Sequence, residues 1–340
     1  MSAATLWRTL AARSGGLSPA ENSPRGAPAA FVVVDWGTSS FRGWLMSADG
    51  EAVAESRGGE GMLHCTGGGA GAGFAPVLRD HLARLGAPAG APVLICGMAG
   101  ARQGWAEAPY LRTPTRLDAL HEGAIRIDAP GDIRILPGIA QARADRPDVM
   151  RGEETQLLGV TEPDFSGLVC IPGTHSKWVG IEAGRVVEFS TYMTGELFSV
   201  ISQHSILAHA IETAGPPPAD SPPFREGLST ALAAPASFTA SLFRLRAAQL
   251  LGFEQRADGA ARLSGLLIGT ELADAARRHG LLGSGPPRSV RLIGAGALGR
   301  LYEAALAGQG LDVTMVDAEQ ASRLGLAKAA IALWGAKVTT

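Results

Sequence analysis

The sequence predicts an α/β protein made of two similar halves. Three observations support this fold class. The chain has 340 residues, which is long enough for about two domains. Apolar runs rich in β-branched residues alternate with segments whose apolar residues recur at helical spacing. A strand-turn-strand pattern with a Gly-Thr turn occurs at Gly37 and again at Gly173, which indicates an internal repeat.

Composition and charge exclude several classes of partner. The formal net charge is −2, so nothing favours a nucleic acid or an acidic membrane surface. No apolar run reaches the ~18 residues that a membrane-spanning helix needs. Cys65, Cys96 and Cys170 are far apart, and two of them belong to apolar runs, which is typical of buried thiols in a reducing compartment. We therefore expect a cytoplasmic protein with a small-molecule substrate.

Residues 1–30 differ in composition from the rest of the chain. They are rich in Ala, Gly, Ser, Pro and Arg, and they lack the apolar centre of about 7–15 residues found in a secretory signal. This composition predicts a disordered leader outside the fold.

Residues 31–46 predict two strands joined by a turn suited to phosphate. The first apolar run ends at Asp35, and Gly37, Thr38 and Ser39 follow before the chain returns as a second strand. Glycine permits close approach of the backbone, hydroxyl and amide groups donate to phosphoryl oxygens, and a carboxylate can hold magnesium directly or through water. An ordinary Thr- and Ser-rich turn explains the same residues, so this segment alone leaves both interpretations open.

The remainder of the first half predicts the order β-β-β-α-β. A third strand is expected at 52–55, a glycine-rich loop at 58–73, a helix at 74–85 and a buried strand at 92–96. A further short strand is expected at 133–136.

A loop that could bind an anionic small molecule follows the buried strand. Residues 97–110 contain three glycines together with Arg102, Gln103 and Trp105. A guanidinium suits a carboxylate, while an amide and an indole suit the hydroxyls and the face of a sugar. The alternative is an exposed loop in which Trp105 only packs against the protein.

Two adjacent carboxylates, Glu153 and Glu154, begin a predicted helix. Acidic residues in a first helical turn are most often solvent-exposed and favoured by the helix dipole. The functional alternative is a general base that takes the proton of an attacking hydroxyl.

The second half repeats the first hairpin at residues 168–192. The new turn contains Gly173 and Thr174, and Ser176 and Lys177 follow it. Gly37 and Gly173 are 136 residues apart, and the later turn glycines at positions 50 and 184 are 134 apart. Two such hairpins facing each other across a cleft could hold a polyphosphate, with the lysine as a cation near the transferred group.

Helices are expected from residue 194 and at 237–251 and 261–279, with a proline-rich surface loop at 216–223.

Near the C-terminus, a strand, the G-x-G-x-x-G pattern at Gly294 and Gly296, a helix and a strand ending in Asp317 follow the order of a dinucleotide-binding unit. Only 23 residues remain after that aspartate, too few for the other half of such a domain, and they predict a closing helix. A glycine turn under an adenine ring explains the same pattern.

Taken together, these motifs resemble those of the sugar kinase, Hsp70 and actin superfamily. The hairpin at 34–40, the hairpin at 172–178 and the glycine turn at 293–296 are similar to its two phosphate elements and its adenosine element. The segments 97–105, 150–156 and 190–197 resemble the 2-dehydro-3-deoxygalactonokinase family more closely than other members.

The resemblance implies two ribonuclease-H-like, or actin-like ATPase, domains with ATP and Mg²⁺ in a central cleft. The boundaries that we expect are a leader at 1–30, an N-terminal domain with the sugar-acid loop at 31–160, a C-terminal nucleotide domain at 161–318, and a closing helix at 319–340 near the domain interface. The implied reaction is transfer of the γ-phosphoryl group to the C6 hydroxyl of a 2-keto-3-deoxy sugar acid, 2-dehydro-3-deoxy-D-galactonate.

The resemblance also implies roles for individual residues. Glu153 is the expected base because Gly152-Glu153 falls where many sugar kinases have Gly-Asp, although the choice between Glu153 and Glu154 stays open. Asp35 would organise magnesium, and Arg102, Gln103 and Trp105 would hold the sugar acid. The phosphates would contact Gly37, Thr38, Ser39, Gly173, Thr174, Ser176 and Lys177, and the adenosine would lie on Gly294 and Gly296.

Several alternatives stay open at this point. The acceptor could belong to the gluconate series, because the sequence does not resolve the configuration at C4. A non-catalytic nucleotide sensor could keep the hairpins, and an NAD-dependent oxidoreductase would use the glycine pattern near the C-terminus. The sequence also leaves open whether the chain forms a homodimer.

Overall fold

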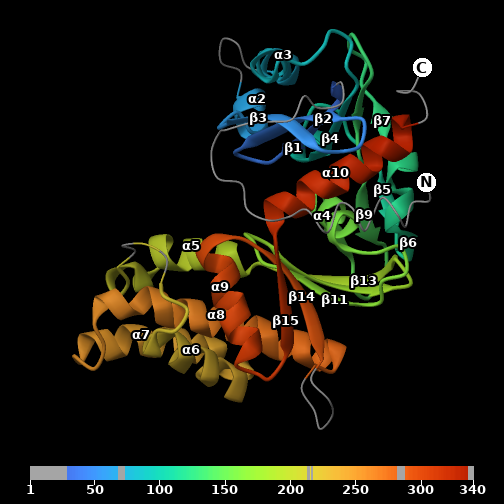
Figure 1. Cartoon of the computed structure of the whole chain (residues 1–340). Helices are drawn as coiled ribbons and strands as arrows, with labels where there is room; N and C mark the ends of the chain where they lie inside the picture. The colour runs from blue at the N-terminus through green and yellow to red at the C-terminus, as the bar shows by residue number, and fades with distance from the viewer. Residues whose placement is uncertain (1–28, 68–72, 213–214, 216, 282–287, 336–340) are drawn as a thin grey trace.

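The computed structural model describes residues 29–67, 73–212, 215, 217–281 and 288–335 (Figure 1). Residues 1–28, which hold nearly all of the predicted leader, lie outside the described ranges. Two six-stranded sheets dominate the structure, one from the first half of the chain and one mainly from the second half.

The first sheet has the order β3-β2-β1-β4-β8-β7. Strand β1 is antiparallel to β2 and parallel to β4. The strands are β1 (Ala29–Trp36), β2 (Phe41–Ser47), β3 (Ala52–Gly58), β4 (Val93–Gly97), β7 (Ile125–Arg126) and β8 (Ile133–Ile135).

The second sheet repeats this arrangement in the order β15-β14-β11-β12-β13-β6. Strand β11 is antiparallel to β12 and parallel to β14, as β1 is to β2 and β4. The turn glycines Gly50 and Gly184 both have positive φ, +85° and +72°. The two sheets confirm the predicted pair of ribonuclease-H-like halves. The strands are β6 (Thr115–Arg116), β11 (Gly167–Ile171), β12 (Ser176–Glu182), β13 (Arg185–Tyr192), β14 (Ser289–Gly294) and β15 (Asp312–Asp317).

A three-stranded sheet, β10-β9-β5, lies beside these two. It consists of β5 (Tyr110–Arg112), β9 (Gly138–Gln141) and β10 (Asp148–Met150). Strand β6 precedes residue 160 yet pairs with β13, so the first half of the chain completes the edge of the second sheet.

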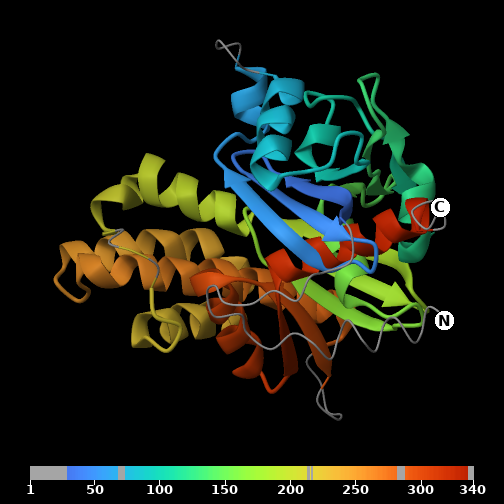
Figure 2. The same cartoon turned by 45° about the horizontal axis from the view of Figure 1, so that its top comes forward.

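The helices gather mainly beside the second sheet, where α5 to α8 extend to one side (Figure 2). The described α-helices are α2 (Met62–Thr66), α3 (Phe74–Leu85), α4 (Glu153–Val160), α5 (Thr194–His204), α6 (Pro222–Ala233), α7 (Phe238–Leu250), α8 (Arg256–His279), α9 (Gly296–Ala307) and α10 (Ala318–Trp334). Short 3₁₀ segments are η1 (Met98–Gly100), η2 (Leu117–Gly123), η3 (Ile206–His209) and η4 (Pro235–Ser237).

Two predicted loops contain helices instead. Helix α6 begins at Pro222, inside the expected proline-rich loop at 216–223. Proline is favoured at the first helical positions because its fixed φ suits a helix and its missing N–H has no partner there anyway. Helix α2 occupies part of the expected glycine-rich loop at 58–73, of which residues 68–72 are outside the described ranges.

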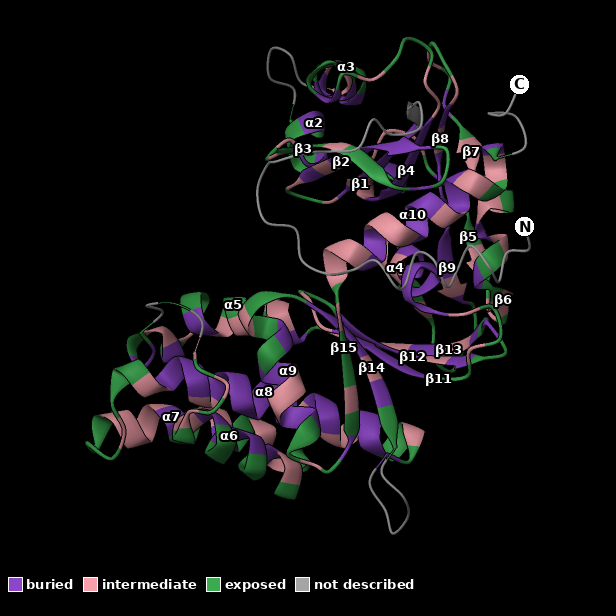
Figure 3. Ribbon diagram, viewed as in Figure 1, coloured by how far each residue is buried: buried purple, intermediate pink, exposed green. Residues whose placement is uncertain are grey.

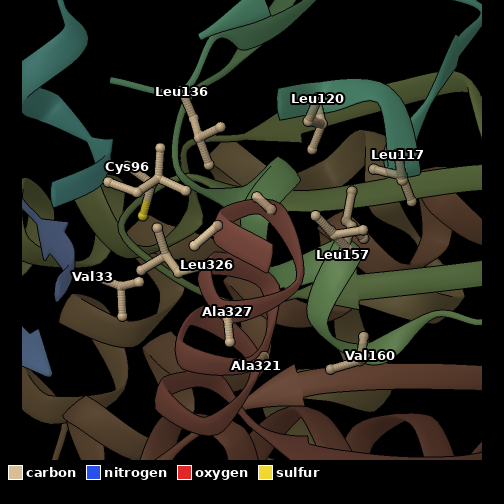
Figure 4. Packing of buried hydrophobic residues seen from close by; sticks show 14 of the residues in the cluster. Val33, Cys96, Leu117, Leu120, Leu136, Leu157, Val160, Ala321, Leu326 and Ala327 are labelled. Atoms are coloured by element: carbon tan, nitrogen blue, oxygen red, sulfur yellow. The ribbon is translucent and has the colours of Figure 1, made fainter. Parts of the chain in front are cut away.

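The largest part of the core lies between the two sheets. Val33 of β1, Val169 of β11, Leu157 of α4 and Leu326 of α10 all belong to it. Figure 4 shows α10 and α4 packed together at its centre, and Figure 3 shows the buried faces of α10 and α8.

Helices α4 and α10 cross with their backbones in contact. A Cβ on Gly325 would lie 1.8 Å from the carbonyl oxygen of Thr155, and a Cβ on Gly159 would lie 2.0 Å from that of Ala321. Lys328 Nζ donates to the carbonyl of Leu158 at 2.8 Å, near the end of α4. The predicted closing helix therefore packs against the helix that connects the two sheets.

Two smaller predictions also have outcomes. The thiols of all three cysteines are free and buried, as expected. Within the ranges that the structure describes, every helix is too short or too polar to cross a membrane.

Candidate active site

The first hairpin turn, between β1 and β2, exposes the side chains of Thr38 and Ser39. The amide of Gly37 donates to the carbonyl of Ser40 at 2.9 Å, which closes the turn. The first amides of α2 donate to the carbonyls of Gly37 and Thr38, each at 3.0 Å, so this helix supports the turn from behind. Backbone hydrogen bonds therefore close the turn, and its two hydroxyl side chains are exposed.

Asp35 lies one residue before the end of β1, at the base of the same turn. Its Oδ2 is 4.0 Å from Nη1 of Arg42, which is its partner across the β1–β2 ladder. Burial raises the pKa of Asp35, while Arg42 and a hydrogen bond from Ser322 of α10 act in the opposite direction. A further positive charge beside this carboxylate would favour its ionised form.

Glu153 connects the two hairpins. Its Oε1 lies 2.8 Å from Nζ of Lys177, which follows the second turn, and the lysine side chain is only 5% exposed against 25% for the glutamate. The charge of Glu153 also raises the pKa of Asp35, so these two carboxylates are close. Residues from both halves of the chain therefore meet at Glu153.

Glu154, the neighbour of Glu153, lies in a different environment. It is 1% exposed, and both carboxylate oxygens accept from the amide of Gly152 at 2.8 Å. Burial, and secondly the charge of Glu153, raises the pKa of Glu154 to about 8. The structure thus separates the two neighbours into one accessible carboxylate and one buried carboxyl group.

A cavity of about 440 Å³ opens beside the second turn. Volumes of about 300–1,000 Å³ are typical of small-molecule sites. Gly173 and Thr174 line the cavity together with residues of α5, α8 and α9. Gly296 begins α9 with φ +58°, two residues before Leu298, which is in the lining, and Gly294 ends β14 just before it.

A larger cavity of about 910 Å³ lies between α6, α8 and the end of α9. None of the predicted site residues lines it. Size alone therefore does not identify the site, and the smaller cavity is the one adjacent to a predicted phosphate turn.

Ser176 does not face this cavity. Its side chain is fully buried, and its Oγ donates to Oε2 of Glu271 at 2.6 Å. The sequence predicts a phosphate contact from this hydroxyl, but the structure places it in the protein interior. Sequence reasoning missed Glu271, although a single acid within the apolar pattern of residues 263–272 was a signal for a buried, hydrogen-bonded carboxylate.

The predicted substrate loop follows β4 and η1. Arg102 and Gln103 are exposed at its tip. The ring of Trp105 stacks on Phe74 at a centroid distance of 5.7 Å and meets Trp36 edge-on at 6.1 Å. The indole of Trp105 therefore packs against the protein, as the alternative interpretation of this loop expects. A contact between Trp105 and a substrate stays a prediction.

Arg151 is a second residue that sequence reasoning missed. Its Nη2 donates to the carbonyl of Ala108 at 2.8 Å, and its guanidinium lies 4.3 Å from the ring centroid of Tyr110. Because Arg151 is two residues before Glu153, it ties the substrate loop to the accessible carboxylate. Its position beside the two glutamates was the available signal.

The dinucleotide-binding pattern near the C-terminus has a different structural role. Strand β14, helix α9 and strand β15 occur in the expected order, but β15 is the edge of its sheet. Helix α10 then packs between the sheets and adds no strand beside β15. The part of the chain that the structure describes therefore lacks the second half of a dinucleotide-binding domain.

Comparison with known proteins agrees with this geometry. A family model described as 2-keto-3-deoxy-galactonokinase matches residues 35–329. The curated protein named probable 2-dehydro-3-deoxygalactonokinase from Rhizobium meliloti strain 1021 is 51% identical over 307 residues, covering 89% of this chain and 97% of the relative. The 2-dehydro-3-deoxygalactonokinase of Escherichia coli K12 is 35% identical over 306 residues, covering 88% and 96%.

A solved structure is similar throughout. The crystal structure of a candidate 2-dehydro-3-deoxygalactonokinase from Sinorhizobium meliloti superposes with a TM-score of 0.84 at 50% sequence identity. The match covers 89% of this chain and 99% of that one.

Proposed function

The chain belongs to the 2-keto-3-deoxy-galactonokinase family, and we propose that it transfers the γ-phosphoryl group of ATP to the C6 hydroxyl of 2-dehydro-3-deoxy-D-galactonate. The observation that carries this proposal is the 51% identity to a curated relative over 97% of that relative's length. The product is the 6-phosphate, an intermediate expected in galactonate breakdown. The gluconate-series acid is the alternative acceptor. No dehydrogenase proposal is retained, because the second half of a dinucleotide-binding domain is not found in the described part of the chain.

Glu153 is the proposed general base. It is accessible, whereas Glu154 is buried and turned toward the backbone of Gly152. In the reaction, the C6 oxygen forms a bond to the γ-phosphorus while the bond between that phosphorus and the β,γ-bridging oxygen breaks. The hydroxyl proton passes to the carboxylate of Glu153, and the electron pair of the broken bond leaves with ADP. General-base assistance of this kind is worth about 10²–10⁴ in rate.

The two hairpin turns would hold the phosphates from opposite sides. Gly37, Thr38 and Ser39 contribute backbone and hydroxyl donors from the first half. Gly173 and Thr174 contribute the second turn, which already lines the cavity. Lys177 would place its ammonium group near the transferred group while Glu153 holds it in position at 2.8 Å. Alignment and charge neutralisation are what phosphoryl transfer chiefly requires.

The donor set around Asp35 fits a magnesium ion. Within the described residues no group of three or more His, Cys, Asp or Glu side chains could hold a metal. Mg²⁺ in kinase sites usually keeps several waters and binds one or two carboxylates plus phosphate oxygens, so a single aspartate at the base of the turn is sufficient. Burial raises the pKa of Asp35, and a magnesium ion beside it would favour the ionised form. Such an ion would neutralise phosphate charge.

The adenosine would occupy the cavity of about 440 Å³, with Gly294 and Gly296 beside it at the start of α9. The sugar acid would lie on the other side of Glu153, where Arg102 and Gln103 would meet its carboxylate and hydroxyls. Trp105 would support that loop through its stacking on Phe74. We further propose the domain division at residues 160 and 318 and a cytoplasmic location; whether the chain forms a homodimer stays open.

The experiment that tests the function is a kinase assay with purified protein, ATP, Mg²⁺ and a panel of 2-keto-3-deoxy sugar acids. We expect ADP formation that depends on the acid and is fastest with the galactonate-series compound, with phosphate found on C6 of the product. Faster turnover of the gluconate-series compound would change the substrate assignment. Absence of acid-dependent ADP formation across the panel would refute the proposed activity.

A further inference from the structure

Glu271 of α8 is a buried carboxylate that accepts four hydrogen bonds. The residue is 3% exposed. Its Oε2 accepts from the hydroxyls of Ser176 at 2.6 Å, Tyr302 at 2.7 Å, and Thr194. Its Oε1 accepts from Nε1 of Trp178 at 2.8 Å. Both oxygens of this carboxylate are therefore satisfied by side chains alone.

The four donors come from the elements that surround the proposed nucleotide cavity. Thr194 begins α5 and is itself in the cavity lining. Ser176 and Trp178 lie at the start of β12, directly after the second phosphate turn. Tyr302 lies on α9, next to Leu301 of the lining. Glu271 itself stands just outside the cavity, one helical turn after the lining residues of α8.

Backbone contacts fix the first residues of α5 to the second phosphate turn. The amide of Glu196 donates to the carbonyl of Thr174 at 3.0 Å. A Cβ on Gly195 would lie only 2.5 Å from the carbonyl oxygen of Gly173, so the two backbones are in direct contact. By holding Thr194, Glu271 therefore also fixes the position of Gly173 and Thr174, the two turn residues that line the cavity.

Stability alone does not require this arrangement. A buried carboxylate loses its hydration, and well-packed apolar residues of similar volume often stabilise a fold at least as well. A carboxylate with four donors instead holds several side chains in one defined geometry, because each donor left without its acceptor is costly in the interior. This chain uses that arrangement behind a ligand cavity, where geometry matters for binding.

We propose that Glu271 is a positioning residue for the nucleotide: it holds the second phosphate turn, the start of α5 and helix α9 in the geometry that binds ATP. This inference rests on the proposed function, since it takes the cavity to be the adenosine site. It assigns to Glu271 no contact with substrate or nucleotide. Its effect passes through Thr194, Ser176 and Tyr302.

The test is nucleotide binding by Glu271→Gln, measured by calorimetric titration with ADP and Mg²⁺ in the absence of sugar acid. In the amide, one of the two acceptor positions becomes a donor, so at least one of the four hydrogen bonds is lost. We expect the Kd of ADP to rise by about tenfold or more, because each disrupted buried hydrogen bond is costly. In the kinase assay, the KM of ATP should rise similarly, while the KM of the sugar acid and kcat at saturating ATP change by less than about threefold.

The matched control is Glu254→Gln. Glu254 also has a largely buried carboxylate, 8% exposed, which pairs with Arg262 on α8. It lines a different cavity from the nucleotide site. We expect this variant to lose thermal stability without a change in nucleotide Kd. An equal effect of the two variants on the Kd would show that Glu271 matters only for general stability and would overturn the proposal.

Tyr302→Phe provides a second, milder measurement. It removes only the hydroxyl that donates to Glu271, so the variant should fold even if Glu271→Gln does not. We expect about a threefold rise in the Kd of ADP, and a non-additive effect when both changes are combined, because the two residues act through one contact. An unchanged Kd in Tyr302→Phe, or fully additive effects, would contradict the proposal. Failure of the wild-type protein to bind ADP would instead refute the proposed function.

Discussion

The two halves of the chain share one strand order but differ at two matched positions. Just before the first turn stands Asp35, and Ile171 occupies the equivalent place 136 residues later. After the turns, Arg42 pairs with Asp35 across the first ladder, whereas its counterpart Lys177 pairs with Ile171 and reaches Glu153. The first hairpin therefore presents a carboxylate beside its own cation, and the second presents an ammonium group that pairs with Glu153 of α4.

The connections that follow the equivalent strands β4 and β14 also differ between the two halves. In the first half, β4 leads to η1 and an exposed loop that contains Arg102. In the second half, β14 leads directly into α9, whose Leu298 and Leu301 line the cavity. Under the proposed function, one repeated scaffold would thus give the sugar acid a polar loop and the nucleotide an apolar wall. Divergence at a few equivalent positions would then be enough for a symmetrical framework to bind two unlike substrates.

The largest expected effect concerns Glu154, which is buried where the two halves meet. Its folded-state pKa of about 8 exceeds the ordinary value of 4.5. The folded protein therefore binds the proton more tightly than the unfolded chain. The stabilisation is fully present below about pH 4.5 and is lost as the pH rises toward 8, with a total on the order of 5 kcal/mol.

Glu154→Gln should remove this pH dependence. Urea unfolding of the wild type and of the variant between pH 5 and 8 measures it. The free energy of unfolding of the variant should increase relative to that of the wild type as the pH rises. Glu51→Gln, at an exposed turn position, serves as the control and should leave the pH profile unchanged. Parallel profiles for wild type and Glu154→Gln would show that the carboxyl group is ionised in the folded protein at neutral pH.

The second effect tests whether Glu153, which contacts residues of both halves, is the general base. Glu153→Gln should lower kcat by at least ~10² while the Kd of ATP changes by less than about threefold, because the carboxylate acts on the acceptor proton. Glu154→Gln is the matched neighbour and should keep kcat within about tenfold of the wild type. A larger loss in Glu154→Gln than in Glu153→Gln would transfer the role of base to the buried residue.

The repeated hairpins could be predicted from the sequence because each has a local pattern of strand, glycine turn and strand. It also located Glu153, Lys177 and Asp35, which come together in space. It could not show that Ser176 turns inward, because that direction depends on Glu271, which is 95 residues away. Nor could it show that α6 begins at Pro222, since proline is equally common in loops and at the start of helices.

The third effect compares the matched turn glycines. Both have positive φ, so alanine is strained at either position by about 1 kcal/mol. At Gly184, the new Cβ would also lie 2.1 Å from the carbonyl oxygen of Pro163, whereas at Gly50 the nearest atom is Cδ1 of Ile331 at 3.1 Å. A side-chain methyl can move, but the backbone carbonyl cannot move without disturbing its neighbours.

Gly184→Ala should therefore destabilise the protein by about 2 kcal/mol or more, and Gly50→Ala by about 1 kcal/mol. Thermal or urea unfolding of the two variants measures the difference. Equal losses would mean that the segment around Pro163 yields easily and that the two turns are equivalent in energy as well as in shape.

The smallest effect concerns the polar loop of the first half. Arg102→Met should raise the KM of the sugar acid about tenfold, because one exposed charge-assisted hydrogen bond to a carboxylate is worth about 1.5 kcal/mol. The KM of ATP should change by less than about twofold, since the nucleotide is proposed to bind on the other side of Glu153. Arg300→Met is the matched control: Arg300 is exposed on α9, which follows β14 as the loop follows β4. It should leave the KM of the sugar acid unchanged. If Arg102→Met raised both KM values equally, the loop would not discriminate between the substrates, and the division of labour between the two halves would have to lie elsewhere.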